Sequence, residues 1–70
     1  MSIRDLIDQF EIQGMFNIKV WNDEISDYEI LANGKDFECE KFNINEDILE
    51  RRITYLYAVD GVLNIEIEEE

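Results

Sequence analysis

The chain has 70 residues, with 18 acidic and 6 basic side chains and no histidine, so its net charge is −12 at pH 7. Such a surface repels phosphate, which argues against direct binding of DNA, RNA or an anionic membrane and favours a protein partner that is basic or indifferent to charge. The length predicts a single domain over residues 1–70, and a hydrophobic fraction of 46% is too high for a disordered acidic tail.

The sequence has no apolar run close to the roughly 20 residues that cross a bilayer. It also lacks, near its start, the basic residues followed by an apolar stretch that mark a secretory signal. The single cysteine, Cys39, has no second cysteine with which to form a disulfide within the chain. We therefore expect a cytoplasmic protein with Cys39 as a small, partly buried apolar residue. A monomer or a weak homodimer is the expected assembly.

The first ten residues predict an amphipathic helix. Ser2 is a suitable N-cap, and Asp5 stands at the third helical position, where an acidic side chain is favourable. Apolar residues recur at helical spacing and form one stripe: Ile3, Leu6, Ile7 and Phe10. Gly14 follows, so we expect the helix to have ended by Glu11.

The next part of the chain alternates between apolar and polar residues, which predicts strands. We expect these strands over residues 15–21, 28–32 and 37–42. Asn33-Gly34 predicts a two-residue type I′ turn, because both central positions of that turn need a positive φ. The sequence therefore predicts a β-hairpin at Asn33-Gly34 that leads into the third strand.

The last part predicts a short helix and a second hairpin. Asn45 is a suitable N-cap, and acidic residues after it favour a helix near residues 45–51. Asp60-Gly61 is a second type I′ signal, and it joins strands over residues 53–59 and 62–67.

The two-residue loop at Asp60-Gly61 also determines the register of the last hairpin. It places Leu56 opposite Ile65 on the face toward the core, with Thr54 opposite Ile67 on the same face. The two tyrosines of the first strand then lie on the other face, opposite polar residues, and we expect that face to be partly solvated.

These elements together predict an α+β fold. A small antiparallel sheet of four to five strands, with β-hairpins at Asn33-Gly34 and Asp60-Gly61, is packed by an N-terminal helix. A second short helix lies near residues 45–51. The order of the strands does not follow from the sequence.

The residue types that most enzymes use are scarce. Without histidine, the chain has neither the commonest general base nor the commonest metal ligand. One cysteine excludes cysteine-rich zinc and iron–sulfur sites, and the three glycines are isolated, which excludes a phosphate-binding loop. Carboxylate pairs are abundant, but among eighteen acids they are expected on the solvated surface. We therefore expect no enzymatic activity, no catalytic residue, no cofactor and no metal site.

Two groups of side chains are candidates for a protein-interaction site. The aromatic candidates are Trp21, Tyr55 and Tyr57, and the acidic candidates are Glu38, Glu40, Glu66 and Glu68. Tryptophan and tyrosine are enriched at interface hot spots, but these three rings also suit a minor core beneath the second helix, which the small size of the protein favours. Acidic residues two positions apart on a strand recur at about 6.6–6.8 Å, close to two base-pair rises of DNA.

Four strings of the sequence are distinctive when taken together: Phe10-Glu11-Ile12-Gln13-Gly14, Trp21-Asn22-Asp23-Glu24, Tyr28-Glu29-Ile30-Leu31 and Tyr57-Ala58-Val59-Asp60-Gly61-Val62-Leu63-Asn64-Ile65. In these strings the chain resembles a group of small acidic proteins encoded on conjugative transposons and phages of Gram-positive, clostridia-like bacteria. The group has no assigned activity. The resemblance implies a mobile-element context and transfers no site residue.

Two functional hypotheses follow. The first is a non-enzymatic protein of a mobile element that acts by binding another protein. The alternative is a DNA mimic that presents carboxylates where phosphates would lie, and so inhibits a host nucleic-acid-binding, restriction or defence protein.

Overall fold

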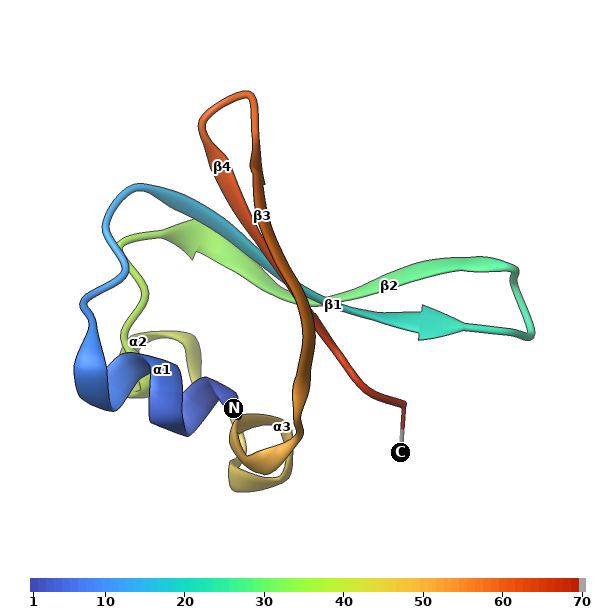
Figure 1. Ribbon diagram of the computed structural model, residues 1–70, viewed down its shortest axis with the longest axis horizontal. Helices are drawn as coiled ribbons and strands as arrows, with labels where there is room; N and C mark the ends of the chain where they lie inside the picture. The colour runs from blue at the N-terminus through green and yellow to red at the C-terminus, as the bar shows by residue number, and fades with distance from the viewer. Residues whose placement is uncertain (70) are drawn as a thin grey trace.

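The computed structural model describes residues 1–69, with the side chain of Cys39 outside the description, and it has an α+β fold. The elements in chain order are α1 (Ile3–Gln9), β1 (Met15–Asn22), β2 (Asp27–Lys35), α2 (Cys39–Phe42), α3 (Glu46–Glu50), β3 (Ile53–Val59) and β4 (Val62–Ile67). The expected burial of Cys39 therefore lies outside the described residues. In Figure 1 the helices are grouped on one side, and the β1–β2 and β3–β4 hairpins project from it in different directions.

The four strands form one mixed sheet in the order β2-β1-β4-β3. Each hairpin is antiparallel, whereas the two central strands, β1 and β4, are parallel. The prediction of a wholly antiparallel sheet is therefore wrong at the central pair. A turn signal in the sequence predicts the relative direction only of the two strands that the short loop joins. The connection from β2 to β3 runs through α2 and α3, and a crossover of that length permits parallel alignment of the strands it separates.

The first hairpin turns at residues 23–26, so the predicted β-hairpin at Asn33-Gly34 is wrong. Asn33 and Gly34 lie inside β2, where they pair with Asn17 and Phe16 of β1. A glycine is needed there because the ring of Phe42 lies against it. A Cβ atom on residue 34 would be 2.5 Å from Cε1 of that ring. The glycine that suggested a turn instead allows the close approach of an aromatic side chain.

Residues 37–42 form the short helix α2 and the segment leading into it, so the predicted third strand is also wrong. A strand would place Phe37 and Phe42 on opposite faces, because their positions differ by an odd number. Both rings instead meet the ring of Phe16 edge-on, with centroid distances of 5.1 and 5.0 Å. Packing of Phe37 and Phe42 against the same ring, that of Phe16, therefore favours a helical turn over a strand in residues 37–42.

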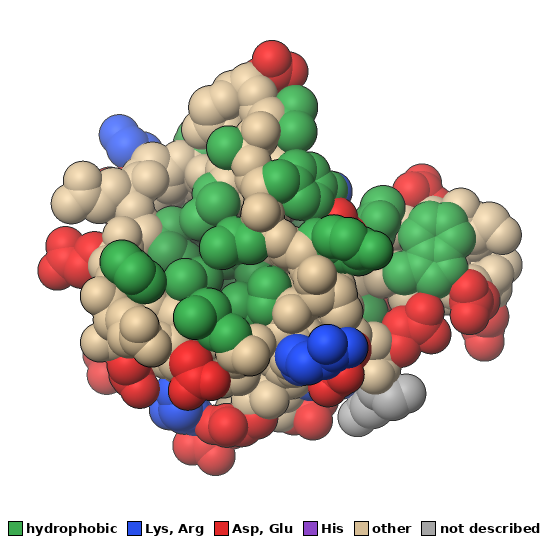
Figure 2. Space-filling view, viewed as in Figure 1, with side chains coloured by type: hydrophobic (Ala, Val, Ile, Leu, Met, Phe, Trp, Pro, Cys, Tyr) green, Lys and Arg blue, Asp and Glu red, His purple; other side chains and the backbone are tan. Residues whose placement is uncertain are grey.

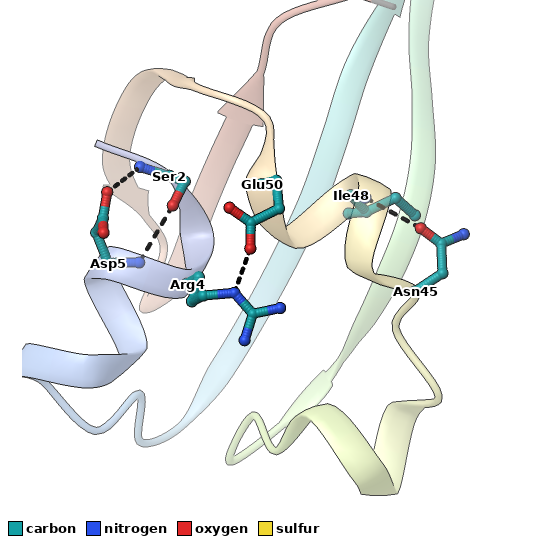
Figure 3. A network of polar contacts seen from close by, with 6 residues as sticks. All are labelled: Ser2, Arg4, Asp5, Asn45, Ile48 and Glu50. Carbon is teal, nitrogen blue, oxygen red and sulfur yellow. Dashed lines mark hydrogen bonds and ion pairs between the residues drawn. The ribbon is translucent and has the colours of Figure 1, made fainter.

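The predicted helix starts are confirmed. The hydroxyl of Ser2 accepts a hydrogen bond from the backbone N–H of Asp5, and the Asp5 carboxylate accepts one from the backbone N–H of Ser2, which completes a capping box. Asn45 caps α3 by accepting from the backbone N–H of Ile48 at 3.0 Å. Figure 3 shows both caps and the Arg4–Glu50 ion pair between α1 and α3. None of the helices in residues 1–69 combines the length and the apolar character that a membrane crossing requires.

The last hairpin has the predicted turn and, over most of its length, the predicted register. Asp60 and Gly61 have φ values of 51° and 78°, and Leu56 pairs with Ile65. An irregularity between residues 53 and 55 makes Ile53, and not Thr54, the partner of Ile67. The hydroxyl of Thr54 instead donates a hydrogen bond to the backbone carbonyl of Glu66.

The core lies between the helices and one face of the sheet. Its buried side chains form a single cluster: Ile3, Leu6, Ile12, Phe16, Ile18, Val20, Phe37, Leu49, Ile65 and Ile67. The cluster joins α1 and α3 to alternate residues of β1 and β4. Within residues 1–69 the helices contribute their buried apolar side chains to this face of the sheet, and the other face remains uncovered by helices.

Candidate functional site

The uncovered face of the sheet gathers an unusual set of side chains. Residues of β1 that alternate with buried ones point to this face. Strand pairing extends the face outward, because directly paired residues of neighbouring strands share a face. We call this surface the open sheet face, and define it by Lys19, Trp21, Tyr28, Tyr55, Tyr57 and Glu66.

The aromatic residues are sorted between the two faces of the sheet. The tryptophan and all three tyrosines of the chain lie on the open sheet face, where Trp21 is 39% exposed, Tyr28 and Tyr57 are each 37% exposed, and Tyr55 is 65% exposed. Three of the four phenylalanines pack against one another on the core side. Tyrosine and tryptophan carry a polar tip as well as a ring, so they suit a surface that is wet on one side.

Helix α3 does not cover these rings. Its buried residue Leu49 lies in the main core, with Ile48 packed against the same cluster. The minor core predicted beneath the second helix is therefore wrong, because a single core takes up the apolar residues of α3. Trp21, Tyr55 and Tyr57 remain accessible as a result.

A buried carboxylate lies beneath the aromatic rings. Glu66 of β4 is only 6% exposed, although it is on the open sheet face. Interaction of the Tyr28 hydroxyl with this carboxylate, together with a smaller effect of desolvation, raises the pKa of Tyr28 to about 12. Tyr28 is on β2 and Glu66 on β4, so the contact spans the strand β1 between them.

A lysine on the same face already interacts with two of the rings. The ammonium nitrogen of Lys19 is 4.6 Å from the centroid of the Tyr28 ring and 5.3 Å from that of Tyr57. Both distances lie in the range of a cation–π interaction. In the parallel register Lys19 is also the direct partner of Glu66. The rings of the open sheet face therefore attract a cation in a position where a carboxylate is close by.

A groove of about 420 Å³ opens at one end of this face. Its aromatic walls are Trp21, Tyr28 and Tyr55, and its acidic lining is Glu66, Glu68 and Glu69. The rings of Trp21 and Tyr28 meet edge-to-face, with centroids 5.2 Å apart. We call this feature the aromatic groove.

The structure brings together some of the predicted site residues and separates others. Trp21, Tyr55, Glu66 and Glu68 line the aromatic groove, and Tyr57 lies on the same face beside it. Glu38 and Glu40 lie elsewhere, next to Asp8 of α1 and at the beginning of α2. The two acidic pairs thus belong to different parts of the molecule.

Two residues of the open sheet face were missed by reasoning from the sequence: Tyr28 and Lys19. A signal for Tyr28 is present, because the polar segment 22–27 joins two alternating strands. A hairpin turn there places Tyr28 directly opposite Trp21, as the structure does. No comparable local signal places Lys19 between two rings, since Tyr57 comes from a strand that is far away in the sequence.

The space-filling view shows how charge is distributed on one side of the molecule. In Figure 2 hydrophobic side chains gather over the middle of the molecule and along the arm formed by β1 and β2, while acidic side chains lie around the outline in several separate places. On this side the carboxylates surround apolar surface and do not form a single acidic patch.

No group of three or more His, Cys, Asp or Glu side chains in the described part of the chain is arranged to hold a metal ion.

Comparison with known proteins gives no match to this chain: no protein-family model matches it, and neither a curated protein nor a solved structure is significantly similar.

Proposed function

We propose that the protein is a non-enzymatic interaction module that binds a basic protein through its open sheet face. The observation that carries the proposal is the placement of the only tryptophan and all three tyrosines on the one face of the sheet that the helices leave uncovered. Tryptophan and tyrosine are the residues most enriched at interface hot spots, because each supplies a large contact area at a small cost in conformational entropy.

The charge of the chain supports a basic partner. A net charge of −12 disfavours a second copy of the same chain, since association would bring two strongly negative surfaces together. The same charge speeds the encounter with a positively charged protein and suppresses acidic competitors. The aromatic rings would then provide the affinity, and the surrounding carboxylates the selectivity for a basic surface.

The alternative of a DNA mimic has less support. Its argument requires pairs of carboxylates at strand spacing, but Glu38 and Glu40 flank the start of a helix. Glu66 is 6% exposed, and Glu68 contacts Arg52, with its Oε2 atom 3.5 Å from the guanidinium Nε atom. Phosphate mimicry needs accessible carboxylates on one contiguous surface, and these four side chains do not provide one.

A mobile-element context, which the resemblance implies, forms part of the proposal. A protein encoded on such an element gains from binding a protein of its host.

The proposal is tested by affinity capture from an extract of the source cells, followed by identification and purification of the captured protein. Binding of the purified partner is then measured by calorimetry for the wild type and for the double variant Tyr55→Ser/Tyr57→Ser. We expect the double variant to lose most of the affinity. Phe10→Ser is the matched control, because Phe10 is 60% exposed but lies at the end of α1, away from the open sheet face.

A partner that binds the double variant as tightly as the wild type would overturn the proposal. A DNA mimic predicts a different pattern: loss of binding when Glu38, Glu40, Glu66 and Glu68 are changed to glutamine, with little effect of the tyrosine changes. It also predicts a steep fall of affinity with salt, since that recognition is electrostatic.

A further inference from the structure

We infer that the aromatic groove binds the guanidinium group of an arginine side chain. This inference rests on the proposed function, because it identifies the chemical group of the basic partner that the open sheet face recognises. The groove is lined by three rings and three carboxylates, a combination that is complementary to an organic cation and to neither an anion nor a neutral apolar group.

The aromatic walls supply the first part of this recognition. Trp21 comes from β1, Tyr28 from β2 and Tyr55 from β3, so three strands contribute one ring each to the same groove. The face of an aromatic ring is electron-rich and attracts a cation placed within about 6 Å of its centroid, most strongly for tryptophan. The Lys19 ammonium group, 4.6 Å from the Tyr28 ring, shows that a ring of this groove already takes part in such a contact.

The carboxylates supply the second part. Glu66 is the most buried polar residue of the lining, and Glu69 is exposed beyond the end of β4, whereas Glu68 is already paired with Arg52. A cation that enters the groove would thus meet a carboxylate in its depth and another at its edge. Charge-assisted hydrogen bonds to carboxylates are about twice as strong as neutral ones.

One contact restrains a wall of the groove before a ligand binds. The indole N–H of Trp21 donates to the Oδ1 atom of Asp23 at 2.5 Å, which restrains the orientation of that wall. Walls restrained before binding reduce the entropy that the complex must lose.

Arginine fits this site better than lysine. The guanidinium group is planar and weakly hydrated, so it stacks on aromatic faces while its N–H groups donate in the plane to carboxylates. The ammonium group of lysine is compact and strongly hydrated, so it gives up more hydration on entering the groove and cannot stack flat on a ring as a guanidinium group can.

The test uses the indole N–H resonance of Trp21 in the ¹⁵N-labelled full chain, which is unambiguous because the chain has one tryptophan. The probes are N-acetyl-argininamide, N-acetyl-lysinamide and N-acetyl-citrullinamide, the last of which has the shape of arginine without its charge. We expect a saturable shift with the arginine probe, weaker binding of the lysine probe, and no saturable shift with the citrulline probe.

Two variants locate the binding. Tyr55→Ser removes one wall and should weaken the arginine probe by about threefold to fivefold. Phe10→Ser is the control, because Phe10 is an aromatic residue of similar exposure that lies at the end of α1, away from the open sheet face, and it should leave the affinity within about twofold. The remaining resonances of each variant report whether the fold is kept, and Tyr55 is exposed enough for its loss to be tolerated.

Three results would overturn the inference: no saturable shift with the arginine probe, an equal response to the citrulline probe, or a preference for the lysine probe. Equal losses in the Tyr55→Ser and Phe10→Ser variants would also overturn it, because binding would then not depend on the aromatic groove. If the tyrosines are needed for a partner but the arginine probe does not bind, the inference fails and the proposed function stands. If the probe binds but the partner ignores the tyrosines, the proposed function fails.

Discussion

The hydroxyl of Tyr28 on β2 interacts with the carboxylate of Glu66 on β4, across the strand β1 between them, and this interaction raises the pKa of Tyr28. The two residues are 38 positions apart in the sequence, and the contact forms only because the two hairpins share one sheet. The Glu66 carboxylate is only 6% exposed, although it lies on the face of the sheet that no helix of residues 1–69 covers. This pair therefore links the strand order of the fold to the shape of the aromatic groove.

The Tyr28–Glu66 contact predicts a loss of stability at high pH. The pKa of Tyr28 is raised from about 10 to about 12 in the folded protein. A raised pKa means that the contribution of Tyr28 to stability is complete below pH 10 and is lost as the pH rises toward 12. We expect the denaturation midpoint of the wild type to fall over this range. Tyr28→Phe should show a smaller fall, and absorbance titration at 295 nm should lose its most alkaline step. An unchanged titration curve in this variant would contradict the assignment.

The contact between Gly34 and Phe42 predicts that Gly34→Ala is destabilising. The added methyl group would lie 2.5 and 2.8 Å from atoms Cε1 and Cζ of the Phe42 ring, which is held in turn by Phe16. Overpacking of this kind costs about 1–3 kcal/mol, measured by urea unfolding. In a Phe42→Ala background the same substitution should cost less, since the obstructing ring is gone. Equal costs in both backgrounds would show that the ring is not the cause.

The last turn predicts that Gly61→Val is destabilising through the backbone alone. Gly61 has a φ of 78°, and no atom lies within 4 Å of where its Cβ would be, so the substitution meets strain and no steric clash. A β-branched residue at positive φ should cost about 1–3 kcal/mol. Gly61→Asn is the control, because asparagine tolerates this conformation. Wild-type thermal stability of the valine variant would refute the type I′ turn and the register that depends on it.

The capping box at the start of α1 predicts a moderate effect of Ser2→Ala. The hydroxyl of Ser2 accepts from the backbone N–H of Asp5 at 3.2 Å, and alanine leaves that donor without this acceptor. Loss of an N-cap costs about 1 kcal/mol, which is about 4–8 °C in the melting temperature of a domain of this size. Ser2→Thr keeps the acceptor and should stay close to the wild type. Calorimetry that finds the two variants equal would argue against the cap.

Features governed by neighbouring residues were predictable from the sequence. The caps at Ser2 and Asn45 are such features, because a side chain bonds to a backbone group three residues away. The turn at Asp60-Gly61 is another, and a two-residue loop necessarily sets the pairing of Tyr55 with Glu66. Part of the candidate site followed from this register, since it placed both tyrosines of β3 on the face away from the core.

Features that depend on distant residues were decided only by the tertiary structure. Asn33-Gly34 has the local signature of a turn, but the ring of Phe42 occupies the space beside Gly34, and β2 continues past it. The parallel pairing of β1 with β4 has no local signal, because it depends on how the two hairpins pack over the common core. The aromatic groove needs one ring from each of three strands, so it exists only once the strand order β2-β1-β4-β3 is set. The sequence by itself determined the short-range hydrogen bonds and backbone angles. Packing of the rings of Phe16, Phe37 and Phe42 against one another, which brings together residues that are distant in the sequence, decided the structure of residues 33–42 against their local preferences.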